Sequence, residues 1–165
     1  MIPARAAAAI TLLLLLPSAA RAKVAEIGVY GDWRSYRDGP VCYMGSEPKK
    51  AEGKYKARDQ PYVFISHRPK DKSLGVIEVG AGYTYKKGSD TDLAIGDKFF
   101  RLFTDGANAW ARDAKTDQAL VAAMKGGKAM VIKGTSSRGT LTTDTYSLAG
   151  FTAAYAAIGK ACKVK

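Results

Sequence analysis

Alternating apolar and polar residues dominate the chain after its first 22 positions. Short stretches rich in Val, Ile, Thr and aromatic residues are separated by Gly, Pro, Asp and Ser, a pattern typical of strands and turns. We expect strands near residues 25–36, 41–46, 62–67, 76–83, 91–95, 99–104, 107–112, 129–133 and 140–146. About nine short antiparallel strands at this spacing predict a mainly β, single-domain β-sandwich.

Three turns join neighbouring strands of this pattern. Gly96-Asp97 and Asp105-Gly106 are dipeptides that tolerate positive φ, so each predicts a tight hairpin. Residues 134–139, Gly-Thr-Ser-Ser-Arg-Gly, pose a sharper question because a glycine-rich loop can also hold a phosphate group. A phosphate loop leads from a strand directly into a helix. Here the loop leads into another strand, so we predict a hairpin with Arg138 at its tip.

Two helices interrupt the β pattern. The segment 116–126 has Thr116 as a candidate N-cap, and its Leu120, Val121 and Met124 would form a buried stripe. The second helix is expected at the C-terminal end, over 148–162 after Ser147 as cap. Its apolar residues recur at three- and four-residue steps and end at a cysteine: Phe151, Ala154, Tyr155, Ile158 and Cys162. The segment 47–61, rich in Lys and Pro, is expected to be the least ordered.

The first 22 residues predict a secretory signal peptide. Arg5 precedes an apolar run over residues 6–16, which is too short for a membrane span, and Ala20 and Ala22 match the pattern that signal peptidase cleaves. We place the cleavage between Ala22 and Lys23 and the β-sandwich domain at 23–165. An uncleaved membrane anchor is the alternative. The prediction is a periplasmic or secreted protein without a stable membrane span.

Positive charge and two cysteines shape the expected partners and stability of such an exported chain. The sequence has 26 basic and 15 acidic residues, and loss of Arg5 and Arg21 would leave a net charge of +9. This favours anionic partners, and export argues against nucleic acid. Cys42 and Cys162 are the only cysteines, and an oxidising compartment favours a disulfide between them. A closed zinc site would need more ligands than these two and one histidine.

The sequence offers little support for catalysis. His67 is the only histidine; we expect it at a strand end and partly exposed, with no identified carboxylate partner. No serine-hydrolase elbow, zinc-protease motif or Walker loop is present. We therefore expect no catalytic residues, no cofactor and no metal. An unrecognised enzyme would need a pocket with polar groups around His67.

Three groups of basic residues are candidates for binding anions, with a purely solubilising surface as the alternative. One lies in the segment 47–61, another comprises Arg68, Lys70 and Lys72, and the third pairs Lys133 with Arg138. The residues that we select as candidate anion-binding positions are Lys49, Lys50, Lys54, Lys56, Arg58 and Arg138. The expected partner is an anionic component of the bacterial envelope or of a host-cell surface.

A different class of function is a periplasmic protein-binding module, an inhibitor or chaperone-like domain that uses an aromatic patch. Trp and Tyr are enriched at protein interfaces, and the candidates are Tyr30, Trp33, Tyr36 and Trp110. The alternative is that both tryptophans fill the core. The exposure of the two indole rings discriminates between these interpretations.

Four segments, with Cys42 between the first two, together resemble the invasion-associated locus B proteins. They are GDWRSYRDG at 31–39, PYVFISHRP at 61–69, FFRLFTDGANAWARD at 99–113 and VIKGTSSRGTLTTDTYSLAGFTAAYAAIGKAC at 131–162. The resemblance extends over nearly the whole mature chain. It implies a small exported bacterial protein of mostly β, sandwich-like fold in the periplasm or outer envelope, and the family's name implies a contribution to host-cell interaction.

The chain departs from part of this family after Trp33. Some members have an additional cysteine there, whereas Arg34, Ser35 and Tyr36 follow in this sequence. The resemblance therefore leaves the Cys42–Cys162 pair as the one available bridge. It carries over no catalytic residue.

Overall fold

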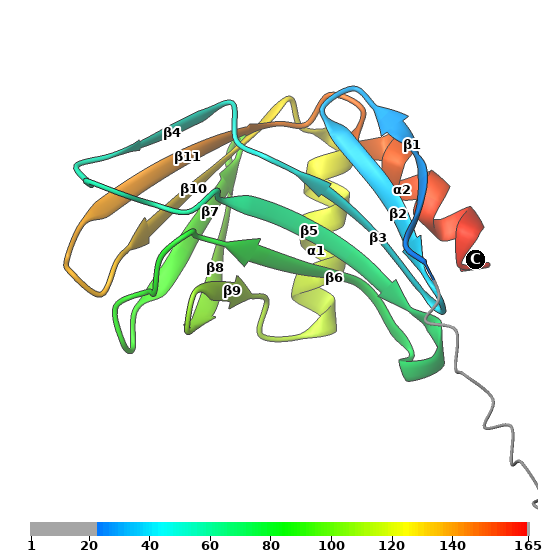
Figure 1. Cartoon of the computed structure of the whole chain (residues 1–165), viewed down its shortest axis with the longest axis horizontal. Coiled ribbons are helices and arrows are strands. Elements are labelled where there is room, and N and C mark those ends of the chain that lie inside the picture. Colours follow the sequence, from blue (N-terminus) through cyan, green and yellow to red (C-terminus); the bar gives the residue numbers. More distant parts are fainter. Residues whose placement is uncertain (1–22, 165) are drawn as a thin grey trace, which may run out of the picture.

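The computed structural model describes residues 23–164, and in this part of the chain eleven strands form one antiparallel sheet. Their order across the sheet is β1-β2-β3-β5-β6-β9-β8-β7-β10-β11-β4. Figure 1 shows that the sheet is strongly curved and that both helices lie on one side of it. The strands are β1 (Ala25–Tyr30), β2 (Trp33–Asp38), β3 (Val41–Ser46), β4 (Lys50–Gly53), β5 (Tyr62–Arg68), β6 (Ser73–Gly80), β7 (Asp90–Ile95), β8 (Lys98–Asp105), β9 (Asn108–Trp110), β10 (Ala129–Thr135) and β11 (Leu141–Ser147).

A single apolar core fills the helix side of the sheet. In β5, Val63, Ile65 and His67 are buried, while Tyr62, Phe64 and Ser66 on the other face are half-buried. This follows from the two-residue period of a strand, which sends neighbouring side chains to opposite faces. Ile65 of β5 and Leu93 of β7 belong to the same buried cluster, although β6, β9 and β8 lie between these two strands in the sheet. The curvature thus lets distant strands share one core.

Helices α1 (Ala114–Gly126) and α2 (Phe151–Ala161) cover this core. Helix α1 packs mainly against β6, and α2 packs against β1, β2 and β3. The predicted stripe of α1 is confirmed, because Leu120, Val121 and Met124 are buried. In α2 the buried residues are Phe151, Ala154 and Ile158. Neither helix within residues 23–164 has the length and apolarity to cross a membrane.

The predicted strands were incomplete in two places. The segment 25–36 is two strands and not one, because Gly31 has a φ of +57° and begins the turn between β1 and β2. The segment 47–61, expected to be the least ordered, contains β4, which pairs with β11 at the edge of the sheet. The mainly β class, the antiparallel pairing, the two helices and the C-terminal position of one helix are confirmed. There are eleven strands where about nine were predicted, and they form one continuous sheet.

Both helix starts also differ from the prediction. The N-cap of α1 is Asp113 and not Thr116, since its carboxylate accepts a hydrogen bond of 2.7 Å from the Thr116 N–H. Helix α2 begins at Phe151 and not at 148, after Gly150 with a φ of +87°. A side chain on Gly150 would place its Cβ 1.9 Å from the Tyr30 carbonyl oxygen. Close contact between β1 and this turn therefore requires glycine at position 150, and the helix begins only after it.

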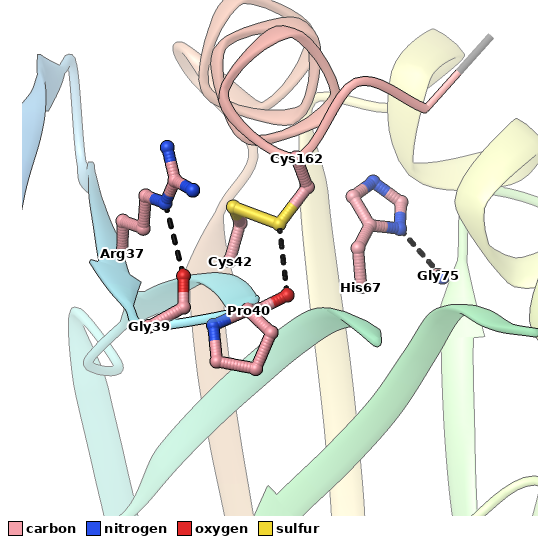
Figure 2. Close-up of a disulfide and its surroundings, with 7 residues drawn as sticks. All are labelled: Arg37, Gly39, Pro40, Cys42, His67, Gly75 and Cys162. Atoms are coloured by element: carbon pink, nitrogen blue, oxygen red, sulfur yellow. Dashed lines mark hydrogen bonds between the residues drawn. A yellow bond between two sulfur atoms is a disulfide. The ribbon is translucent and has the colours of Figure 1, made fainter. Parts of the chain in front are cut away.

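The Cys42–Cys162 disulfide is confirmed. It joins β3 to the residue that follows α2, and Figure 2 shows it beside His67. The Cys162 sulfur lies 3.5 Å from the Pro40 carbonyl oxygen. The predicted signal peptide and its cleavage between Ala22 and Lys23 involve positions outside the described residues, so they stay predictions.

Candidate functional site

Three loops meet at the end of the sheet opposite α2 and the C-terminus (Figure 1). They are the segments 54–61 after β4, 81–89 after β6, and 136–140 between β10 and β11. Backbone hydrogen bonds connect them: Asp59 N–H donates to the Gly82 carbonyl at 3.0 Å, and Ser137 N–H donates to the Thr84 carbonyl at 2.8 Å. The three loops therefore form one cluster, although they are far apart in the sequence.

A buried ion pair between Arg58 and Asp144 fixes the first loop. Both Asp144 carboxylate oxygens accept hydrogen bonds from the Arg58 guanidinium, at 2.7 and 2.6 Å, and Arg58 Nε donates to the Ala81 carbonyl at 2.7 Å. The two side chains are only 2% and 6% exposed. The guanidinium also lies 5.0 Å from the centre of the Tyr83 ring. Such a two-pronged, charge-assisted pair sets the orientation of the loop as well as its position.

This arrangement corrects the prediction for Arg58. We selected it as an anion-binding candidate because it lies among lysines, but its guanidinium is buried and donates three hydrogen bonds to Asp144 and Ala81. Sequence reasoning could not see this pairing, because Asp144 lies 86 positions further along the chain. Arg58 supports the loop cluster, and its charge is already neutralised by Asp144.

Lys54, Lys56 and Arg138 border a cleft of about 440 Å³ that residues of all three loops line. All three are exposed. Hydroxyl groups of Ser137, Thr140 and others also line the cleft. The structure thus brings three of the six predicted anion-binding residues to one place.

Two further lysines, missed by the sequence analysis, project from the second loop. Lys86 and Lys87 are exposed, and the Lys86 N–H donates to the Thr135 carbonyl at 2.9 Å, which holds this loop beside the hairpin. The signal was the pair of lysines before Gly88. Apart from Arg58, the three loops carry five basic residues, and none of these five lies within 4.0 Å of a carboxylate among residues 23–164. Asp59 is the one acidic residue in the three segments.

Lys49 and Lys50 lie elsewhere and have acidic partners. Lys49 forms an ion pair with Asp32, and Lys50 on the edge strand β4 forms one with Glu52 at 2.9 Å. Their charges are therefore partly neutralised on the protein itself. These two candidates do not join the loop cluster.

The 134–139 segment is a hairpin loop, as predicted. Strands β10 and β11 pair up to Thr135 and Leu141, and helix α2 follows only after β11. Within the loop the N–H groups of Ser136, Ser137, Gly139 and Thr140 donate to acceptors of the protein. These N–H groups are not free to hold an anion, so recognition here would depend on side-chain charge.

His67 is buried and not partly exposed, which corrects the prediction. Its side chain is 1% exposed, and Nδ1 accepts a hydrogen bond of 3.0 Å from the Gly75 N–H. Burial lowers the pKa of this imidazole. The described residues contain no group of three or more His, Cys, Asp or Glu that could hold a metal ion.

The aromatic candidates separate between the two sides of the sheet. Trp33 is fully buried, and its Nε1–H donates to the Ser147 carbonyl at 3.1 Å, so it is a core residue. Tyr30 is half-buried and packs against the core. Tyr36 and Trp110 are half-buried, each beside another aromatic ring, Tyr43 and Phe103 respectively. The four predicted residues do not form one patch.

Comparison with known protein families identifies the chain's relatives. The family described as Invasion associated locus B (IalB) protein matches residues 34–159. The matched range includes all three loops of the cluster, strands β3 to β11 and most of α2. No curated protein and no solved structure matches the chain.

Proposed function

Because this chain belongs to the invasion-associated locus B family, we propose that it is an exported, non-catalytic envelope protein that binds an anionic component of the envelope or of a host-cell surface. The disulfide supports export, since such bonds persist mainly in oxidising compartments. In this proposal the predicted signal peptide directs the chain to the periplasm or beyond. Binding takes place at the loop cluster.

One observation carries this proposal: five basic side chains without an acidic partner project from three adjoining loops. They are Lys54, Lys56, Lys86, Lys87 and Arg138. A single exposed ion pair contributes about 0 to 1 kcal/mol. Several such contacts are needed, so the ligand should carry repeated phosphate or sulfate groups.

The buried Arg58–Asp144 pair gives this basic surface a defined shape. The pair holds the loop with Lys54 and Lys56 against β11. Strand β11 directly follows the hairpin loop that contains Arg138. The planar guanidinium of Arg138 can form two parallel hydrogen bonds to one phosphate or sulfate group, which an ammonium group cannot do. Arg138 is therefore the residue expected to orient the ligand, with the lysines supplying attraction.

A triple charge reversal tests the proposal. We expect K54E/K56E/R138E to lose roughly tenfold or more in affinity for phosphatidylglycerol vesicles and for heparin, because attraction becomes repulsion at the cleft. Wild-type binding should weaken steeply as salt rises, since charges are screened within about 8 to 10 Å at physiological ionic strength. Sedimentation with vesicles and elution from a heparin column measure the two effects.

A matched control changes the same net charge at other exposed positions. Lys98, Lys128 and Lys160 lie outside the three loops, so K98E/K128E/K160E should bind much more like the wild type. Equal losses of affinity in the two triple variants would show that binding depends on the total charge of the protein and not on a specific site. An affinity that does not change with salt concentration, or no binding at low salt, would contradict the proposal.

A further inference from the structure

A second hollow lies on the sheet face that the helices do not cover. Its volume is about 810 Å³, and its floor consists of four aromatic side chains from three neighbouring strands: Tyr36 of β2, Tyr43 of β3, and Tyr62 and Phe64 of β5. We call it the aromatic groove. The rings form a continuous row, with centroid distances of 5.3 Å for Tyr36–Tyr43, 5.7 Å for Tyr43–Phe64 and 4.5 Å for Phe64–Tyr62.

Two glycines let rings of this row lie close to the backbone of the sheet. Gly45 is opposite Phe64, and Gly80 is opposite Tyr62, in adjacent antiparallel strands. A Cβ on Gly45 would lie 2.4 Å from the Phe64 ring, and a Cβ on Gly80 would lie 2.3 Å from the Tyr62 ring. Each ring therefore covers a glycine of the neighbouring strand. All four aromatic residues are half-buried, which leaves part of each ring accessible from the groove.

Hydrogen bonds restrict the ring at one end of the row. The Tyr62 hydroxyl lies 3.2 Å from Glu78 Oε1 and 3.3 Å from Asn108 Oδ1, on strands β6 and β9. The glycine below the ring and a hydrogen bond from the hydroxyl to one of these two acceptors restrict the orientation of Tyr62. A preorganised aromatic surface loses little conformational entropy when a ligand binds.

The rim of the groove is polar and electrically balanced. Among the lining residues, Asp32 and Glu47 are acidic and Arg34 and Lys49 are basic, with Gln60 as an uncharged amide. The lining contains no Leu, Ile, Val or Met. This balance contrasts with the whole chain, whose net charge is +11. An uncharged ligand with many hydrogen-bonding groups fits such a rim, whereas a charged one gains no net attraction there.

We propose that the aromatic groove binds an uncharged glycan chain. The C–H groups on one face of a sugar ring carry partial positive charge and pack against the electron-rich faces of aromatic rings. The sugar hydroxyls then find donors and acceptors at the rim, in Arg34, Gln60 and Glu47. A row of rings matches successive sugars better than a single sugar, so affinity should grow with chain length.

Titration calorimetry with uncharged hexasaccharides tests this assignment. The probes are chitohexaose, cellohexaose and maltohexaose, each compared with its disaccharide, added to the oxidised protein without its predicted signal peptide. We expect at least one hexasaccharide to bind, its disaccharide to bind more weakly, and the affinity to change little with salt. Y43A, which removes the ring between Tyr36 and Phe64, should lower the affinity roughly tenfold or more.

F99A is the matched control, because Phe99 is a 79% exposed aromatic residue outside the groove. It should bind the hexasaccharide as the wild type does. Amide chemical shifts of the wild-type protein give a measurement that does not depend on a variant's folding, and the shifted amides should belong to β2, β3 and β5. The K54E/K56E/R138E variant should also bind normally, which separates this site from the loop cluster.

Three results would overturn the assignment. The first is no binding of any uncharged hexasaccharide at millimolar concentration. The second is binding of hexagalacturonate, an acidic sugar chain, in preference to all of the uncharged ones. The third is binding of a proline-rich peptide, and of no glycan, to the same amides.

Discussion

Different chemistry stabilises the two ends of the curved sheet. At the end with the C-terminus, the Cys42–Cys162 disulfide attaches the region after α2 to β3, among buried apolar residues such as Ile158. At the other end, the Arg58–Asp144 ion pair attaches a loop to β11. The surroundings there are polar, since the Tyr83 hydroxyl and Thr142 Oγ1 form a hydrogen bond of 2.7 Å nearby. One tie is covalent and the other is electrostatic.

The difference shows what each tie contributes. A disulfide stabilises mainly by restricting the unfolded chain and has little need of a particular surrounding. A buried ion pair has a large desolvation cost and stabilises only when its hydrogen bonds are complete. In return, its geometry specifies how the loop lies. The ion pair, and not the disulfide, therefore determines the shape of the basic cleft.

Breaking the ion pair should have the largest effect on stability. R58A leaves the Asp144 carboxylate buried without its partner, which costs about 3 to 5 kcal/mol. Urea unfolding followed by circular dichroism measures the change. The double variant R58M/D144L should be much more stable than R58A, because it leaves no uncompensated charge. Equal stability of these two variants would mean that the pair has no special electrostatic role.

An exposed ion pair provides the control for that experiment. Arg112 Nη2 lies 2.7 Å from Asp90 Oδ1, and the two side chains are 59% and 33% exposed. R112A should therefore cost less than about 1 kcal/mol. A loss as large as that of R58A would mean that burial does not set the strength of these pairs.

Removing the disulfide should have a somewhat smaller effect. We expect C42A/C162A to lower the free energy of unfolding by about 2 to 4 kcal/mol, because the cysteines lie 120 positions apart and close a long loop. The loop cluster is remote from this bond, so heparin binding should be unchanged in the folded variant. Reduced wild-type protein should unfold at the same urea concentration as the variant. An unchanged urea midpoint would contradict the expected contribution.

Acid should lower the free energy of unfolding through His67, which lies beside the disulfide. This effect should be smaller than that of breaking the ion pair or removing the disulfide. Burial lowers the pKa of His67 below its usual value of 6.5, so the unfolded chain binds a proton at higher pH than the folded protein. Stability attributable to this residue is complete above pH 6.5 and decreases as the pH falls through the folded pKa. H67Q should reduce this decrease, as urea unfolding at several pH values would show. An identical pH dependence in H67Q would contradict the prediction.

Asp117 acts in the opposite direction over this range. Burial raises the pKa of its carboxyl group, so the folded protein binds that proton at higher pH than the unfolded chain. Its contribution to stability therefore increases as the pH falls. Comparison of H67Q with wild type separates the two groups, because both proteins retain Asp117.

The sequence predicted the fold class well because strand and turn signals are local. The Gly96-Asp97 and Asp105-Gly106 hairpins were correct, yet the same kind of signal at Gly31-Asp32 was overlooked and two strands were merged. Strand β4 was missed for a different reason. All four of its residues are exposed, so it has no apolar pattern, and its pairing with β11 is a long-range contact.

The candidate site was predicted only in part, for the same physical reason. The composition identified Lys54, Lys56 and Arg138. It did not reveal the ion pairs that Arg58 forms with Asp144 and Lys49 forms with Asp32. The aromatic groove was not predicted, because its rings come from alternate positions of three strands and become neighbours only in the sheet. Tyr36 was singled out, but for a patch that does not form.

The position of β4 also has a consequence for the order of folding. This strand follows β3 in the sequence, but its partner β11 ends at Ser147, so it stays unpaired until most of the chain is available. The disulfide likewise waits for Cys162. Folds dominated by such distant contacts form slowly, on the order of milliseconds to seconds. The β4 edge of the sheet and the disulfide can therefore be completed only once the last strand and α2 are available.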